Sequence, residues 1–178
     1  EFSGAPFYKM VVKPDAGVRP QNAIVCGAAC FGLYTSIIGS RIAKYTYGVE
    51  ANDKYDGASF SPDEAEYDEW LEEFRIRKVF SQIVPVGTGI APLQKFVRKD
   101  YFPIYKDQTS IPFVVYRSES PNPRLTTDPG CTKVGSVTLA CKGTDKFDVA
   151  FTFGSEIRVD VTSADGEKFA STTVSLDD

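Results

Sequence analysis

The stretch from residue 97 to residue 120 constrains the fold most strongly, because two apolar blocks flank five polar residues there. The blocks span residues 101–105 and 111–116, and their β-branched and aromatic residues are typical of strands. The polar connection at residues 106–110 has the composition of a hairpin loop. The second block is apolar at both alternating sets of positions, so both faces of that strand need a cover. Neighbouring loops would cover the outer face in an ordinary sandwich, whereas a ligand would cover it in a binding protein.

The composition limits the functions that the chain can have. With 178 residues, of which 42% are hydrophobic, the chain is long enough for one globular domain. Its formal net charge of −4, without a long basic cluster, argues against nucleic acid and anionic membranes as partners. No apolar run approaches the length of a membrane span. The chain contains no histidine, which removes the commonest general base and the commonest metal ligand, so an enzyme is the least favoured class.

Four cysteines bear on the cellular compartment and on metal binding. Cys26 and Cys30 are four residues apart among alanines and glycines, so we expect small, buried apolar residues on one helix face. No further ligands at a suitable spacing indicate a metal site. Cys131 and Cys141 flank one expected strand, and a disulfide between them is one possibility. Because the sequence shows no secretion signal, free thiols in a reducing, cytoplasmic setting are favoured.

The first forty residues are expected to hold a strand at residues 7–12 and a helix that begins at Pro20. Gly27 inside that helix costs about 1 kcal/mol relative to alanine, which implies a close packing partner. These two elements bury little surface by themselves, so they look like the end of a larger α/β unit. We therefore expect one unit at residues 1–40 and a second at residues 41–178.

The segment at residues 61–78 has the features of an amphipathic helix. Ser61 suits the N-cap, Pro62 the first helical position and Glu64 the capping box. Four apolar residues recur at helical spacing and are expected to dock on the rest of the domain, namely Tyr67, Trp70, Leu71 and Phe74. The acidic residues between them are expected to form either a solvated face or a binding patch.

The remaining segments are predicted to be strands. Strict alternation at residues 147–153 indicates a half-buried strand, and Asp165-Gly166 has the composition of a hairpin turn. About eight short strands separated by turns predict a mainly β fold, an antiparallel β-sandwich. The expected ranges are 45–51, 79–84, 101–105, 111–116, 133–140, 147–153, 156–162 and 169–176.

The order of these segments resembles that of 70 kDa heat-shock chaperones. Gly27-Ala28-Ala29 is similar to the closing segment of their ATPase domain, and Tyr47-Gly48-Val49-Glu50 is similar to the first strand of their substrate-binding β-domain. Residues 106–110 resemble the loop that arches over the peptide groove, and residues 147–153 and 157–168 resemble later strands. Three stretches favour the divergent heat shock 70 kDa protein 12 branch, namely residues 27–33, 45–49 and 107–111.

This resemblance implies a domain organisation and a function. Residues 1–40 would be the end of an ATPase domain with its linker. Residues 41–178 would be a substrate-binding β-sandwich with a helical insertion at residues 61–78. Such a module holds unfolded or extended apolar polypeptide segments, and in a full-length parent it would also contact its own ATPase domain. The residues that the resemblance places at the peptide are Val49, Phe102, Tyr105, Pro112, Val114 and Phe147.

The resemblance also identifies departures from the family. Nearly all of the ATPase domain and its phosphate loops are missing, so we expect no ATP hydrolysis by this chain and ATP only in a full-length parent. Pro112 has no N–H to donate to a neighbouring strand or to a peptide. Together with the acidic insertion, Pro112 supports an alternative function, a scaffold or protein-interaction β-sandwich that has lost client binding.

Overall fold

The computed structural model describes residues 20–33 and 39–175 of the 178-residue chain. The chain divides into two units, residues 1–39 and residues 40–178. The described part of the first unit is one helix, α1 (Pro20–Leu33), at the position expected from the sequence. The strand expected at residues 7–12 lies outside the described residues.

The helix α1 leaves its small residues uncovered. Cys26 and Cys30 are exposed, so the expectation that they are buried is wrong. Ile24 and Val25 are exposed as well. No other part of the described chain lies within 4 Å of the place where a Gly27 Cβ would be. The physical reason for the exposed thiols is that α1 is the whole described part of the first unit, so no other described element of that unit covers it.

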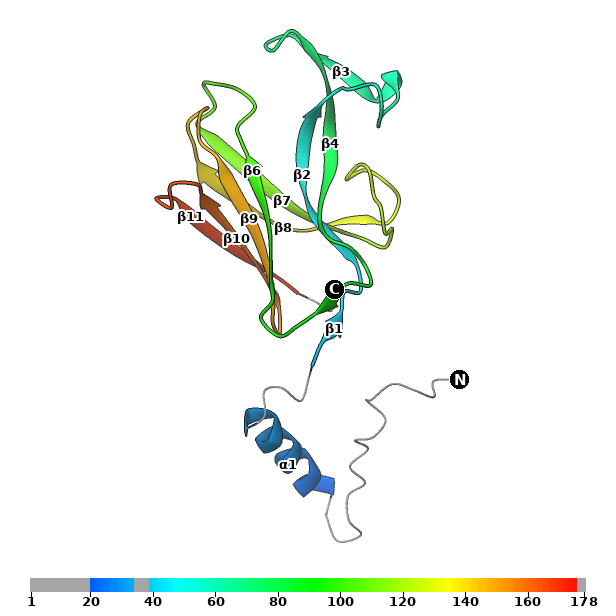
Figure 1. The fold of residues 1–178 in the computed structure, drawn as a ribbon, viewed down its shortest axis with the longest axis vertical. Coiled ribbons are helices and arrows are strands. Elements are labelled where there is room, and N and C mark those ends of the chain that lie inside the picture. Colours follow the sequence, from blue (N-terminus) through cyan, green and yellow to red (C-terminus); the bar gives the residue numbers. More distant parts are fainter. Residues whose placement is uncertain (1–19, 34–38, 176–178) are drawn as a thin grey trace. The chain divides into compact units, whose positions relative to one another are not determined.

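The second unit is a β-sandwich (Figure 1). One sheet has five strands in the order β3-β4-β2-β7-β8, the other has four in the order β11-β10-β9-β6, and β1 pairs with β5 in a short third sheet. All pairings are antiparallel, which confirms the predicted fold class. The strands are β1 (Arg41–Ile42), β2 (Thr46–Lys54), β3 (Ala65–Asp68), β4 (Glu73–Val84), β5 (Gly89–Ile90), β6 (Lys95–Tyr101), β7 (Ser110–Ser118), β8 (Cys131–Ala140), β9 (Phe147–Phe153), β10 (Ile157–Ser163) and β11 (Phe169–Val174).

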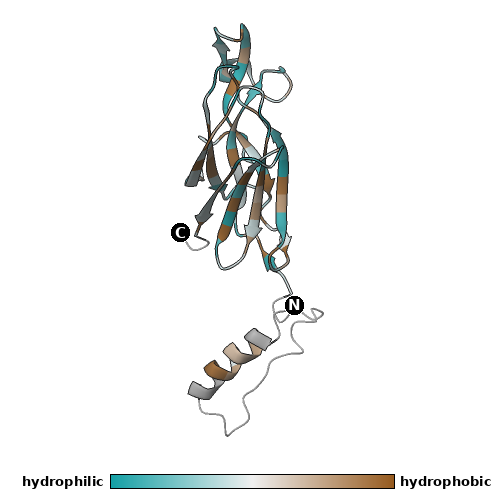
Figure 2. Cartoon of the chain, turned by 90° about the vertical axis from the view of Figure 1, so that its left-hand side faces the viewer, coloured by the Kyte–Doolittle hydropathy of each residue, from teal (hydrophilic) through white to brown (hydrophobic). Residues whose placement is uncertain are grey.

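The core lies between the two large sheets and follows from the alternation of the strands. Val149 and Phe151 of β9 are fully buried, as the sequence pattern predicts. Across the core, the rings of Phe113 in β7 and Phe147 in β9 meet edge to face, with centroids 5.8 Å apart. Figure 2 shows the alternation as brown and teal bands along the strands. Packing of these inner faces is the main source of stability in a sandwich of this kind.

The expected hairpin at residues 97–120 does not form. The strand β6 ends at Tyr101 and pairs with β9, whereas β7 pairs with β2 and β8 in the opposite sheet. The connection at residues 102–109, which we call the crossing loop, therefore passes from one sheet to the other. Pro103 interrupts the first apolar block and has no N–H for a strand ladder. Asp100 has a φ of 65°, in the left-handed region, and lies where the pairing of β6 with β9 is irregular, between Arg98 and Tyr101.

The predicted helix at residues 61–78 is also wrong. Its capping box at Ser61 and Glu64 forms, but it begins only a 3₁₀ turn, η3 (Pro62–Glu64). The strands β3 and β4 follow as a hairpin in which Tyr67 lies opposite Phe74. Polar and apolar residues alternate strictly in the first half of β4, and Ile76 there is fully buried. Side chains alternate with a period of two along a strand, and pairing of β4 with β2 stabilises the strand. This tertiary pairing outweighs the helical spacing of the same residues.

Candidate functional site

The strands β2 and β7 separate from each other toward one end of the sandwich. Their pairing runs from Thr46 opposite Ser118 to Val49 opposite Val115, and it ends there. The strand β2 continues to Lys54 beside β4 only, and the first part of β7 runs beside β8 only. Residues 50–54 and 110–114 therefore each keep one strand edge that is not paired within the described sheets.

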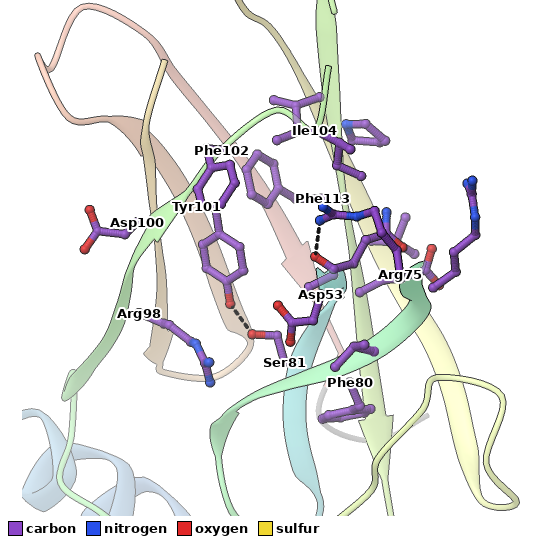
Figure 3. Close-up of a pocket in the computed structure, with 18 of the residues that line it drawn as sticks. Asp53, Arg75, Phe80, Ser81, Arg98, Asp100, Tyr101, Phe102, Ile104 and Phe113 are labelled. Atoms are coloured by element: carbon purple, nitrogen blue, oxygen red, sulfur yellow. Dashed lines mark hydrogen bonds between the residues drawn. The ribbon is translucent and has the colours of Figure 1, made fainter. Parts of the chain in front are cut away.

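A cavity of about 560 Å³ occupies the space where the strands separate. Its walls come from residues of β2, β4, the end of β6, the crossing loop and the start of β7 (Figure 3). This volume falls in the range of sites that accept a small ligand or a few side chains. We call this cavity, with the two unpaired strand edges beside it, the groove.

The floor of the groove joins the two sheets. The hydroxyl groups of Ser81 in β4 and Tyr101 in β6 share a hydrogen bond of 2.7 Å (Figure 3). The ring of Tyr101 meets Phe113 edge to face, with centroids 5.8 Å apart. Burial raises the pKa of Tyr101, so its hydroxyl stays protonated at neutral pH and serves as a fixed link between the sheets.

The crossing loop that borders the groove is held by its own polar side chains. The Gln108 side chain accepts a hydrogen bond of 3.1 Å from the N–H of Ile104 and donates one of 2.7 Å to the carbonyl oxygen of Ser110. A Cβ at Gly143 would lie only 2.5 Å from the Lys106 carbonyl carbon. Glycine at that position therefore lets the β8–β9 connection pack directly against the loop backbone.

Asp68 connects the β3–β4 hairpin to the crossing loop. Its buried carboxylate accepts a hydrogen bond of 2.7 Å from the Tyr105 hydroxyl and further bonds from the backbone N–H groups of Trp70 and Leu71. The hydrogen bond from Tyr105, followed by those from the backbone, holds the pKa of Asp68 below its ordinary value of 3.8. One ionised carboxylate thus orders both the hairpin turn and the loop beside the groove.

The groove carries charges of both signs at its border, and several of them have no partner of opposite charge. Arg98 donates a hydrogen bond of 2.9 Å to the backbone carbonyl of Gln82, and both Arg98 and Lys99 are exposed without an ion pair among the described residues. Arg75 forms an ion pair with Glu73, but its Nε–H is buried without an acceptor. The groove therefore has spare hydrogen-bond donors for a ligand.

Four of the six residues expected at a peptide line this groove. Phe102 and Pro112 are exposed there, and Tyr105 and Val114 are partly buried. The other two, Val49 and Phe147, are fully buried in the sandwich core and do not line the groove. Their position follows from strand alternation, which directs Val49 inward and its neighbour Glu50 toward the groove.

Sequence reasoning missed most of the polar residues of the groove. Ser81 and Tyr101 lie in different sheets, and nothing in the sequence indicates that their hydroxyl groups meet. Arg75 lies in the segment that was predicted to be a helix, so its place on β4 beside the groove could not be foreseen. A strict alternation at residues 73–77 is the one signal that would have placed Arg75 on a strand.

Two features are absent from the part of the chain that the structure describes. The described residues contain no cluster of three or more metal-binding side chains. None of the described helices has the length and apolar character needed to cross a membrane.

The sequence is similar to that of a known protein from two organisms. No protein-family model matches the chain. Human heat shock 70 kDa protein 12A is 29% identical over 154 residues, and the mouse protein of the same name is 28% identical over 153 residues. The sequence of the chain is thus similar to that of a protein whose name places it among the 70 kDa heat-shock proteins. The similarity covers 80% of this chain but only 22% of each of the two curated relatives.

Proposed function

We propose that the groove binds extended apolar peptide segments, as the client-binding module of a heat-shock-70-type chaperone. The observation that carries this proposal is the separation of β2 and β7 after Val49 and Val115. An extended peptide gains most of its affinity from backbone hydrogen bonds to unpaired strand edges and its specificity from side-chain pockets. The groove offers both features next to each other.

The groove side chains suit an apolar segment. Phe102 from the crossing loop and Val114 from β7 supply apolar surface at the groove, and Phe102 is 62% exposed. Because the ring is already outside the core, a ligand can cover it without disturbing the fold. Covering it removes apolar surface from water, which favours binding. Pro112 provides no backbone donor, so on β7 the peptide would have to rely on carbonyl groups and on the other N–H groups.

Similarity to heat shock 70 kDa protein 12A supports this proposal, although the chain spans about a fifth of that protein. The client class, the holding of unfolded chains and the dependence on an ATPase domain are proposed for the module. We expect no nucleotide hydrolysis by the 178-residue chain, because no glycine-rich phosphate loop occurs in it.

A titration tests the proposal. A fluorescent apolar heptapeptide is titrated with the chain and followed by anisotropy, and the same peptide without the dye is then added as a competitor. Saturable binding that the unlabelled peptide reverses is the expected result. A heptapeptide of glycine and serine serves as the matched ligand control and should not bind. Equal anisotropy changes with both peptides would contradict a groove that selects apolar segments.

The exposed hairpin supports a second candidate function, a protein-interaction module. Trp70 is 83% exposed, and Tyr67 and Phe74 beside it are each 53% exposed. Exposed aromatic residues in a group mark interaction surfaces more often than chance. This function predicts that the hairpin binds a partner while apolar peptides do not bind the groove, so the titration above separates the two functions.

A further inference from the structure

The connection between β3 and β4 forms an apolar knob with acidic residues on both sides. This connection, residues 69–72, is called the hairpin tip. Its Trp70 is the only tryptophan of the chain and is 83% exposed. Glu69 and Glu72 are the two end residues of the tip, and both are exposed without an ion pair among the described residues. A surface that matches this tip needs an apolar hollow with free cationic groups beside it.

The hairpin tip is held in a fixed conformation. The carboxylate of Asp68 accepts hydrogen bonds of 3.1 Å and 3.2 Å from the backbone N–H groups of Trp70 and Leu71. Behind the tip, the rings of Tyr67 and Phe74 meet edge to face with centroids 5.1 Å apart. A tip that is ordered before binding loses little conformational entropy when it docks.

The groove of the same chain has the complementary features. Phe102 and Val114 supply apolar surface in a cavity of about 560 Å³, which is large enough for one indole ring. Basic residues outnumber acidic ones in its lining by four (Arg75, Arg77, Arg98 and Lys99) to three (Glu50, Asp53 and Asp100), and Arg98 and Lys99 have no ion-pair partner among the described residues. Within one copy the tip does not fill this groove, because Trp70 remains 83% exposed.

We propose that two copies of this chain associate by placing each hairpin tip in the groove of the other copy. The proposal rests on the groove described above, and the occupant follows from the match of apolar and charged groups on the two surfaces. Figure 1 shows the hairpin of β3 and β4 and the crossing loop at the same end of the sandwich. Two copies that face each other at this end can therefore exchange tips about one two-fold axis, the commonest symmetry of homo-oligomers.

The indole of Trp70 reports this contact directly. At low concentration its emission should be that of a water-exposed indole. As the concentration rises from about 10 µM to about 1 mM, the range of weak complexes, the emission should shift to shorter wavelength while sedimentation shows a dimer. Trp70→Ala should weaken the dimer by about tenfold or more, as is usual for a central aromatic anchor. A concentration-independent emission, or a Trp70→Ala variant that dimerises like the parent, would overturn the proposal.

Mixing two variants tests whether the tip meets the groove. Trp70→Ala keeps its groove, and the double variant Arg98→Glu/Lys99→Glu keeps its tip. All three side chains are exposed, so both variants should fold. Each alone should dimerise about tenfold or more weakly than the parent, and at a concentration where each alone is monomeric the mixture should form a 1:1 pair through one remaining contact. A mixture that stays monomeric would overturn the proposal.

The client-binding function is measured separately on Trp70→Ala. This variant should bind the apolar heptapeptide as the parent does, because Trp70 does not line the groove. In the parent, the same peptide should return the Trp70 emission to that of the monomer. Loss of dimerisation with retained peptide binding would leave the groove function intact, whereas absence of peptide binding would remove the proposed function itself.

Discussion

The hydroxyl of Tyr105 donates a hydrogen bond of 2.7 Å to the buried carboxylate of Asp68. The two residues are 37 positions apart, one in the crossing loop and the other at the end of β3. This bond is the largest cause of the lowered pKa of Asp68. It joins the inserted hairpin to the loop that borders the groove, so the position of the loop depends on a segment outside the sandwich core.

Replacing Tyr105 by Phe should lower the free energy of unfolding at neutral pH. The loss relative to the parent should be smaller in acid. A lowered carboxyl pKa in the folded state adds stability above the ordinary value of 3.8, and this stability is lost as the pH falls through the folded-state pKa. The difference in unfolding midpoint between parent and Tyr105→Phe should therefore shrink between about pH 5 and pH 2. Chemical denaturation at several pH values measures it.

Tyr55→Phe is the matched control, because the Tyr55 hydroxyl has no hydrogen bond among those of the described residues. A pH-independent difference between the parent and Tyr105→Phe would contradict the role of Asp68. So would an equal loss of stability in the Tyr55→Phe control.

Replacing Val114 by Phe should fill the groove without disturbing the core. Val114 lines the groove and is partly exposed, whereas its neighbour Val115 is fully buried between the sheets. We expect Val114→Phe to change the free energy of unfolding by less than about 1 kcal/mol and to abolish peptide binding. Val115→Phe overpacks the core and should cost about 1–3 kcal/mol. Similar stability losses for both variants would show that Val114 is an ordinary core residue.

Replacing Gly143 by Ala should displace the crossing loop. The added Cβ would lie 2.5 Å from the Lys106 carbonyl carbon, which is backbone and cannot turn away. We expect a loss of about 1–3 kcal/mol in the free energy of unfolding together with weaker peptide binding. Gly89→Ala is the control, since its Cβ would meet open space. Thermal unfolding and peptide titration of both variants measure this effect, and unchanged peptide affinity in Gly143→Ala would count against a positioned loop.

Replacing Trp70 by Ala should leave the stability of the monomer within about 0.5 kcal/mol of the parent value, because the ring is 83% exposed. Phe113→Ala removes a core ring that is 2% exposed and should cost about 3–5 kcal/mol. Denaturant unfolding at low protein concentration compares the two variants. A large loss for Trp70→Ala would mean that the ring packs on the domain after all.

The sandwich could be predicted from the sequence because its strands carry their own pattern. Residues 147–153 alternate strictly, and the alternating apolar residues are the ones buried in the core. The segment at residues 61–78 misled the prediction because four residues, Tyr67, Trp70, Leu71 and Phe74, fit helical spacing and a capping box precedes them. The segment forms strands because β4 pairs with β2, and this contact joins residues that are distant in sequence.

The groove could be predicted only in part. The apolar residues Phe102 and Val114 lie in a segment whose composition and resemblance point to a binding surface, and both line the cavity. The Ser81–Tyr101 and Asp68–Tyr105 hydrogen bonds link residues from different strands and loops. No local pattern encodes such contacts, because they depend on how two sheets and an insertion come together.

Amide hydrogen exchange with and without a saturating apolar heptapeptide tests the central claim most directly. A peptide that lies between β2 and β7 should slow exchange at those N–H groups of residues 50–54 and 111–114 that point away from β4 and β8, into the space where β2 and β7 separate. Residues of β10 and β11, at the far edge of the other sheet, should exchange at unchanged rates. Protection confined to other strands, or no protection at saturating peptide, would contradict the account.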